Sequence, residues 1–290
     1  GSEMCIRDRE ISLEHPVAED INIIVLADMR SDFTEEEFRN FDAYLERGGN
    51  LFILGEPKRQ QFMNPVIERL GLRFADGIIV SPSEVNLDDL VAANIKEGAA
   101  KVSENYIRYF RSGYSIMTPS ACAVEVIDSA KGFEITEVLA SAGKGSWVEK
   151  ETTDFINEKS VLNPAVGEVE KSNSIMLYLT RPVNNKEQRI FVIGDADCIS
   201  TLELSQNRPG FRSSNFTLIT ETFRNLSYGE FPVEASRVNP PDDRVLVTRN
   251  VIFGIRVVLM WIIPLLFVTG CITLLIRRKR RSVSYTHLTL

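Results

Sequence analysis

The residues from Val257 to Ile276 contain no charged side chain and are predominantly apolar. A helix of about 20 such residues is long enough to cross the hydrocarbon core of a bilayer. The alternative is a buried core helix, but the helices of soluble domains usually carry a polar stripe. We therefore predict a transmembrane helix over 255–276, and we expect Pro264 to kink it.

Five basic residues follow the apolar run directly: Arg277, Arg278, Lys279, Arg280 and Arg281. Basic residues flanking a membrane span stay preferentially on the cytoplasmic side. This bias predicts a cytoplasmic basic stub over 277–281 and places residues 10–254 outside the cytoplasm. Because such a domain must be translocated, we expect a signal peptide or further hydrophobic spans upstream in the intact protein.

The two ends of the chain are related through the genetic code. One codon choice for Met4–Asp8, ATG-TGT-ATA-AGA-GAC, has a reverse complement that encodes Val-Ser-Tyr-Thr-His, the sequence of residues 283–287. Both ends resemble a translated sequencing adapter, so we interpret 1–9 and 282–290 as adapter-derived and exclude them from the fold. The genuine fragment is then 10–281, and a first strand before Glu10 stays open.

Charge excludes one broad class of function. The 290 residues include 33 Lys and Arg against 40 Asp and Glu, a net charge of −7. A nucleic-acid-binding protein is expected to present a basic face, and the basic residues here are concentrated at the C-terminal end. We expect no nucleic-acid partner and a lipid bilayer as one partner.

The sequence of the extracytoplasmic part contains clear signals for a first strand and for the start of the helix that follows it. The apolar run Ile21–Ala27 predicts a strand covered on both faces. Thr34 and Glu37 have the spacing of a capping box, and Phe33 and Phe38 that of a hydrophobic staple. Leu51–Leu54 predicts the next strand.

Further strands and helices alternate along the chain. We predict strands at Gly77–Val80, Ser174–Thr180 and Arg189–Gly194, a helix over 62–70 that ends at Gly71, and a last helix with Phe216, Ile219, Phe223 and Leu226 on one face and Ser214 or Asn215 as its cap. This order predicts an α/β fold with a mostly parallel sheet. Residues 81–162 are an irregular insertion with short strands near Ile116, Val124, Val126 and Ile135. We expect an α/β domain over 10–232 and, from its prolines, a membrane-proximal linker over 233–254.

Several segments together resemble a known family. Asp20–Asp28, Phe33–Glu37 and Tyr44–Leu54 are similar to the opening of the GldG-like auxiliary family of gliding-motility-type ABC transporters, and Phe191–Asp197 and Asn215–Leu226 resemble its late strand, Gly-Asp loop and last helix. The resemblance implies a flavodoxin-like or glutamine-amidotransferase-like domain without known catalysis. It implies as partners an ABC-2 type permease, fused upstream in some members, and a separate ABC ATPase, in the prokaryotic cytoplasmic (inner) membrane.

Three carboxylates mark the candidate ligand-binding site. Asp195 and Asp197 follow the predicted strand Arg189–Gly194, and Asp28 follows Ile21–Ala27. Ligands of open α/β sheets bind at the carboxyl ends of the strands, where these groups could hold a cation or sugar hydroxyls. The alternative is that Asp195 and Asp197 cap the next segment and that Asp28 is an ordinary loop carboxylate.

We expect no catalytic residues, no metal site and no cofactor. A thiol hydrolase on this fold needs a cysteine at a tight turn and a histidine base, but neither Cys122 nor Cys198 lies in a Gly-x-Cys-x-Gly elbow and His15 is the one genuine histidine. These two cysteines are either a disulfide or two buried free thiols. The chain has no phosphate-binding P-loop, so ATP hydrolysis is expected from a partner.

The sequence thus favours a non-catalytic, membrane-anchored auxiliary component of an ABC-2 type transport system, with a ligand-sensing or substrate-binding domain. Two alternatives stay open. One is a stand-alone extracytoplasmic module that binds a glycan or peptide, and the other is a degenerate amidotransferase-like hydrolase.

Overall fold

The computed structural model describes residues 11–128, 131–206, 208, 210–231 and 249–285. The chain divides into two compact units, Gly1–Val233 and Glu234–Leu290. The first holds all strands of the described residues, and the second holds the apolar helix.

Seven strands form the central sheet of the first unit: β1 (Ile23–Ala27), β2 (Asn50–Leu54), β5 (Leu90–Ile95), β6 (Ile116–Pro119), β8 (Glu134–Ala140), β10 (Ser174–Val183) and β11 (Lys186–Ile193). Their order is β1-β2-β11-β10-β8-β5-β6. The neighbours β1, β2 and β11 run parallel, and the remaining pairs are antiparallel. The predicted α/β class is confirmed, with a sheet that combines both kinds of pairing.

Two smaller sheets flank this one. They pair β3 (Leu72–Phe74) with β7 (Val124–Val126) and β4 (Ile78–Val80) with β9 (Trp147–Glu149). The strand expected near Gly77 therefore forms outside the central sheet. The segment 81–162, to which the sequence assigned no topology, supplies β5, β6 and β8 of the central sheet.

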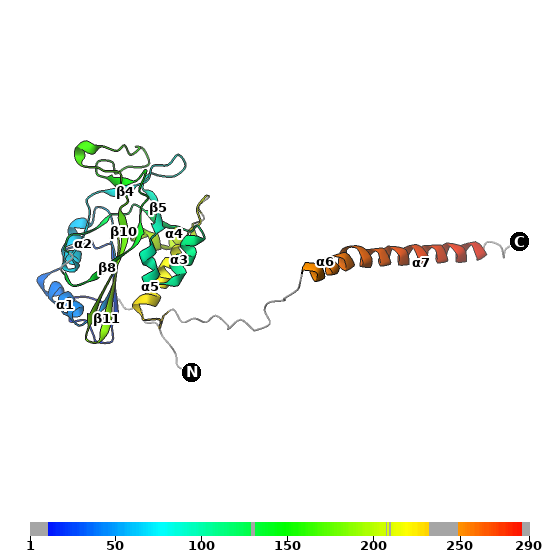
Figure 1. Cartoon of the computed structure of the whole chain (residues 1–290), viewed down its shortest axis with the longest axis horizontal. Helices are drawn as coiled ribbons and strands as arrows, with labels where there is room; N and C mark the ends of the chain where they lie inside the picture. Colours follow the sequence, from blue (N-terminus) through cyan, green and yellow to red (C-terminus); the bar gives the residue numbers. More distant parts are fainter. Residues whose placement is uncertain (1–10, 129–130, 207, 209, 232–248, 286–290) are drawn as a thin grey trace. The chain divides into compact units, whose positions relative to one another are not determined.

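Helices cover both faces of the central sheet (Figure 1). They are α1 (Glu35–Glu46) and α2 (Gln60–Ile67) on one face, and α3 (Glu104–Arg111), α4 (Thr201–Ser205) and α5 (Asn215–Leu226) on the other. Alternate residues of a strand point to opposite faces. In β2, Leu51 and Ile53 accordingly join the core beneath α1 and α2, whereas Phe52 and Leu54 join the core that includes α3 and α5.

The predicted start of α1 is confirmed. The Thr34 hydroxyl accepts a hydrogen bond from the backbone N–H of Glu37 at 3.2 Å, and the Glu37 carboxylate accepts one from the N–H of Thr34 at 2.7 Å. Phe33 and Phe38 lie edge to face with ring centroids 5.3 Å apart. These contacts satisfy helix N–H groups that have no partner within the helix.

Two expectations about burial are wrong. The strand β1 is not covered on both faces, because it lies at the edge of the sheet and leaves Val25 44% exposed. Phe216 is not on the buried face of α5 but is 71% exposed. The hydroxyl of Tyr106 donates to the Leu218 carbonyl and contacts Thr222, so α5 turns that side toward α3.

An antiparallel hairpin joins β10 to β11, although the sequence was interpreted as separate strands of a mostly parallel sheet. Its two-residue turn is Asn184-Asn185, with positive φ angles of 49° and 64°. Asparagine tolerates this left-handed backbone better than most residues. The pair was therefore a hairpin signal in the sequence.

The second unit contains one helical rod made of α6 (Arg249–Val257), a π-helical segment (Val258–Ile262) and α7 (Ile263–Tyr285). Among the described residues, one helix, Phe253–Lys279, is long and apolar enough to cross a membrane, with a mean hydropathy of 2.5. The predicted span lies within it. The π segment precedes Pro264, which lacks the N–H that a regular turn requires. Most of the predicted linker and most of the two adapter-like ends lie outside the described residues.

The backbone at the end of β11 lies very close to another segment. The Gly194 carbonyl accepts a hydrogen bond of 2.7 Å from the N–H of Cys122, and the Gly194 N–H donates to the Ile175 carbonyl at 2.9 Å. A Cβ atom at position 194 would lie 1.9 Å from the Cys122 carbonyl oxygen. This approach requires glycine.

Gly194→Ala should therefore destabilise the domain by about 1–3 kcal/mol, the usual cost of overpacking a close-packed interior. Gly143→Ala is the matched control, because its Cβ would meet nothing within 4 Å. The comparison uses urea unfolding of the full chain in neutral detergent, followed by near-ultraviolet circular dichroism. Equal unfolding midpoints for the two variants would contradict the close approach.

Candidate functional site

The three parallel strands end level with one another. Ala27 of β1 is paired with Leu54 of β2, which is paired with Ile193 of β11. The pairing continues one residue further, because the Asp28 N–H donates to the Leu54 carbonyl and the Gly55 N–H donates to the Ile193 carbonyl. The loops after these strands carry Asp28, Glu56, Asp195 and Asp197, which we call the acidic edge.

Asp28 is held by two arginines. Its carboxylate accepts hydrogen bonds from Arg30 at 2.6 Å and from Arg59 at 3.2 Å, and its backbone has a positive φ of 41°. Burial opposes ionisation, but the hydrogen bonds and charges of the two arginines outweigh it and lower the pKa of Asp28. Asp28 is therefore an ionised and paired carboxylate.

Asp195 is completely buried. Its Oδ1 accepts hydrogen bonds from the N–H groups of Asp197 at 2.8 Å and Cys198 at 3.2 Å, the first two residues of the 3-10 turn Asp197–Ile199, and so holds the start of this turn. Its Oδ2 has no hydrogen-bond partner among the described residues. Burial, reinforced by the nearby charge of Glu56, raises the pKa of Asp195 well above the usual range.

Glu56 is the residue of this edge that the sequence analysis missed. Burial raises its pKa from 4.5 to about 7, and the charges of Asp197 and Asp28 add to the effect. A signal for it was present, because Glu56 lies two positions after the end of β2, as Asp195 lies two positions after the end of β11. Its electrostatic coupling to all three predicted site residues groups them at one edge.

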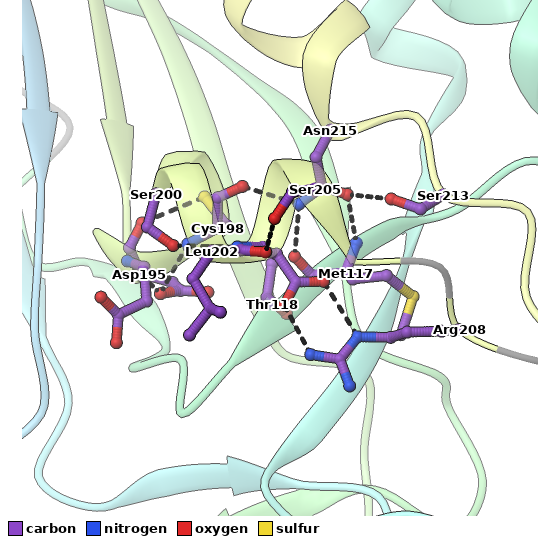
Figure 2. Close-up of polar contacts among 12 residues, drawn as sticks. Met117, Thr118, Asp195, Cys198, Ser200, Leu202, Ser205, Arg208, Ser213 and Asn215 are labelled. Carbon is purple, nitrogen blue, oxygen red and sulfur yellow. Dashed lines mark hydrogen bonds and ion pairs between the residues drawn. The ribbon is translucent and has the colours of Figure 1, made fainter.

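Asp197 is exposed, in contrast to Asp195. Figure 2 shows the segment that follows it, which is fixed by the side chain of Asn215. The Asn215 amide donates at 2.7 Å to the carbonyls of both Met117 and Cys198, and its oxygen accepts from the Met117 N–H at 2.9 Å. The turn bearing Asp197 is thereby tied to β6 and to the start of α5.

The acidic edge offers little to a metal ion. In the described part of the chain, no group of three or more His, Cys, Asp or Glu side chains is arranged to hold one. Two cavities, of about 430 Å³ and about 320 Å³, have linings that include none of the four edge carboxylates. Among these four carboxylates, Asp197 is the exposed one, so it is the most accessible for a contact with a ligand.

Among the described residues of the α/β unit, Cys122 and Cys198 are buried free thiols. Burial raises the pKa of Cys122, with further contributions from Glu56 and Asp195, and burial together with Asp195 raises the pKa of Cys198. A nucleophilic cysteine requires the opposite shift, toward the thiolate. Neither thiol is activated in this environment.

The shifted pKa of Glu56 makes folding stability depend on pH. Between about 4.5 and about 7 the native side chain keeps its proton while the unfolded chain has lost it, so stability falls as pH rises through this window. Glu56→Gln should remove that slope. Above the window it should stabilise the domain by about 1–2 kcal/mol, after allowance for solvent screening at this half-buried side chain.

The measurement is the free energy of unfolding of the full chain in neutral detergent across this window. Glu84→Gln is the control, because it removes an exposed loop carboxylate and should leave the slope unchanged. If Glu56→Gln and the original chain kept the same slope and the same stability at high pH, the assigned environment of Glu56 would be wrong.

A family model described as an ABC-type uncharacterized transport system matches residues 6–227, and no curated protein is significantly similar in sequence. The solved structure of the mmIFT52 N-terminal domain is 16% identical, covers 72% of this chain and 78% of its own, and has a TM-score of 0.50. A ThuA-like protein from Parabacteroides merdae is 12% identical, with coverages of 66% and 75% and a TM-score of 0.34.

The likeness to the mmIFT52 domain is one of fold, given the low identity. The family match spans nearly the whole α/β unit and includes all four residues of the acidic edge. The chain therefore belongs to the auxiliary family of ABC-type transport systems and has a transport-associated accessory role.

Proposed function

We propose that this chain is a non-catalytic, GldG-like auxiliary component of an ABC-2 type transport system. Its α/β domain lies outside the cytoplasm of a prokaryotic cell, and its C-terminal helix anchors it in the cytoplasmic membrane. It works beside a permease and a separate ATPase. The single observation that carries the proposal is the family match over residues 6–227.

The C-terminal helix supports the membrane part of the proposal. Its apolar side chains are exposed, including Trp261 at 73% and Phe267 at 71%. In water this surface would be costly, whereas in lipid it is favourable. The basic residues 277–281 at one end favour a cytoplasmic C-terminus.

The environment of the thiols supports a non-catalytic role. The hydrolase alternative needs an activated cysteine, whereas Cys122 and Cys198 are fully buried and carry raised pKa values. The ligand-binding part of the proposal rests on the acidic edge. Within it, Asp197 offers an exposed carboxylate, Asp195 positions the turn, and Asp28 is held by its two arginines.

The proposal predicts that the full chain copurifies with an ABC permease and an ATPase. Cells that produce the protein are treated with a short crosslinker, solubilised in mild detergent and fractionated on an affinity tag carried by the chain. Mass spectrometry should identify both a multispanning permease and a protein with a phosphate-binding P-loop.

The control is an unrelated single-span membrane protein with the same tag, produced at the same level. Recovery of the chain without either transporter subunit, in amounts matching this control, would contradict the proposed function. A stand-alone binding module would give that result.

A further inference from the structure

The central sheet has one closed edge and one open edge. At the closed edge, β6 is paired with β5 on one side and covered by the segment before α5 on the other. The Ser115 N–H donates to the Arg212 carbonyl at 3.0 Å, and the Met117 N–H donates to the Asn215 side chain at 2.9 Å. Pro119, the last residue of β6, has no N–H that could pair with another strand.

The strand β1 forms the opposite edge, and among the described strands it is paired with β2 alone. Asn22 and Asp28, which flank β1, both make backbone hydrogen bonds to β2. The backbone groups of successive residues in a strand point to opposite sides, so Ile23, Val25 and Ala27 direct theirs away from β2. This side of β1 is a row of donors and acceptors for which the described residues supply no strand.

The side chains of β1 do not protect this edge. Soluble proteins usually protect an exposed edge strand with a charged side chain, a proline or a bulge, but β1 reads Ile-Ile-Val-Leu-Ala. Val25 is 44% exposed, and Ala27 is also exposed. Both lie on the face that carries α5, because Ile23 packs in the same core as Phe223, whereas Ile24 packs in the core beneath α1. The edge thus combines unpaired backbone with uncovered apolar side chains.

A second copy of β1 fits this edge in one register. A closed dimer pairs the same surface of both copies about a two-fold axis, and identical strands side by side in such a dimer are antiparallel. To exchange hydrogen bonds, outward-pointing residues must lie opposite each other. With Val25 opposite Val25 of the second copy, Ile23 lies opposite Ala27, and all outward residues of β1 are paired. Any other register leaves at least one of them without a partner inside the strand.

The charges at the two ends of β1 agree with this register. Past the strand ends, Asn22 lies opposite Asp28 of the second copy, and the exposed Asp20 is brought toward the exposed Arg30. Arg30 binds Asp28 of its own chain through Nε and Nη2, which leaves Nη1 for Asp20 of the second copy. Like charges do not face each other along this pairing, so repulsion does not oppose it.

We propose that the chain forms a two-fold homodimer in which β1 of each copy pairs antiparallel with β1 of the other, centred on Val25. The two seven-stranded sheets then become one continuous sheet. Val25 of each copy covers Val25 of the other on the face that carries α5. This dimer goes beyond the proposed function and requires neither the permease nor the ATPase.

Disulfide crosslinking of the full chain in neutral detergent tests the centre of the register. The background carries Cys5→Ser and Cys271→Ser, whereas Cys122 and Cys198 are buried and are kept. Val25→Cys should give a disulfide-linked dimer under mild oxidation. Hydrogen-bonded partners in an antiparallel pair have Cα atoms about 5.5 Å apart, which is within reach of a disulfide.

Neighbouring positions test the rest of the register. Ala27→Cys alone should not crosslink, because the two residues at position 27 would lie four residues apart along the pair, about 14 Å. A mixture of the Ile23→Cys and Ala27→Cys chains should crosslink, because these residues lie opposite each other. The control is Val85→Cys, at an apolar residue that is 85% exposed outside β1, and it should give background crosslinking.

A charge at the centre of the edge should separate the copies. Val25→Lys should make the chain monomeric by size-exclusion chromatography with light scattering, since a lysine on an edge strand disfavours pairing with another strand. Val25→Thr keeps a β-branched side chain and should stay dimeric. Thermal unfolding followed by circular dichroism verifies that both variants fold. Both retain the C-terminal helix, so any association through that helix would be the same in both.

Three results would overturn the proposal. A monomeric original chain, with no more crosslinking at Val25→Cys than at Val85→Cys, would leave the open edge for a strand from the upstream sequence or from a transporter subunit. Equal crosslinking of Val25→Cys and of Ala27→Cys alone would show association without the proposed register. A folded Val25→Lys chain that stays dimeric would place the interface elsewhere.

Discussion

The level ending of β1, β2 and β11 is the constraint on which the rest of the domain depends. Backbone hydrogen bonds from Asp28 to Leu54 and from Gly55 to Ile193 continue the pairing past the strands. The contact between Gly194 and Cys122 then joins this edge to the segment that leads into β7. Because β2 is buried on both faces, the sheet needs a helical layer on each side, and both cores form around it.

This register also explains the electrostatics of the acidic edge. Three parallel strands that end together bring their following residues together, so the carboxylates of Glu56 and Asp197, which are 141 residues apart in sequence, interact. The carboxylates of the acidic edge are accommodated in two ways, by pairing with arginines or by burial that favours the neutral form. Asp28 is paired with arginines, whereas burial disfavours the charged forms of Glu56 and Asp195. Such concentrations of perturbed carboxylates are more frequent at functional sites than elsewhere.

Local signals in the sequence predicted local structure well, and long-range pairing poorly. The capping box at Thr34 and the buried strand Leu51–Leu54 depend on neighbouring residues, and both are confirmed. The side of α5 that faces the core is held by a contact distant in sequence, from the Tyr106 hydroxyl to the Leu218 carbonyl, and Phe216 is exposed instead. Asp28, Asp195 and Asp197 were recognised because each follows a strand, whereas Glu56, which also follows a strand, was overlooked and was identified from its coupling to them. Their role in ligand binding remains a prediction.

We propose that a C-terminal helix anchors the domain outside the cytoplasm. The most direct test determines on which side of the cytoplasmic membrane the domain lies. Lys144→Cys places a thiol on an exposed turn, whereas Cys122 and Cys198 are buried. Intact cells producing this variant are exposed to a membrane-impermeant maleimide, with the chain lacking the substitution as control. The account predicts labelling of Lys144→Cys in intact cells. Labelling that appears only after the cytoplasmic membrane is permeabilised would contradict it.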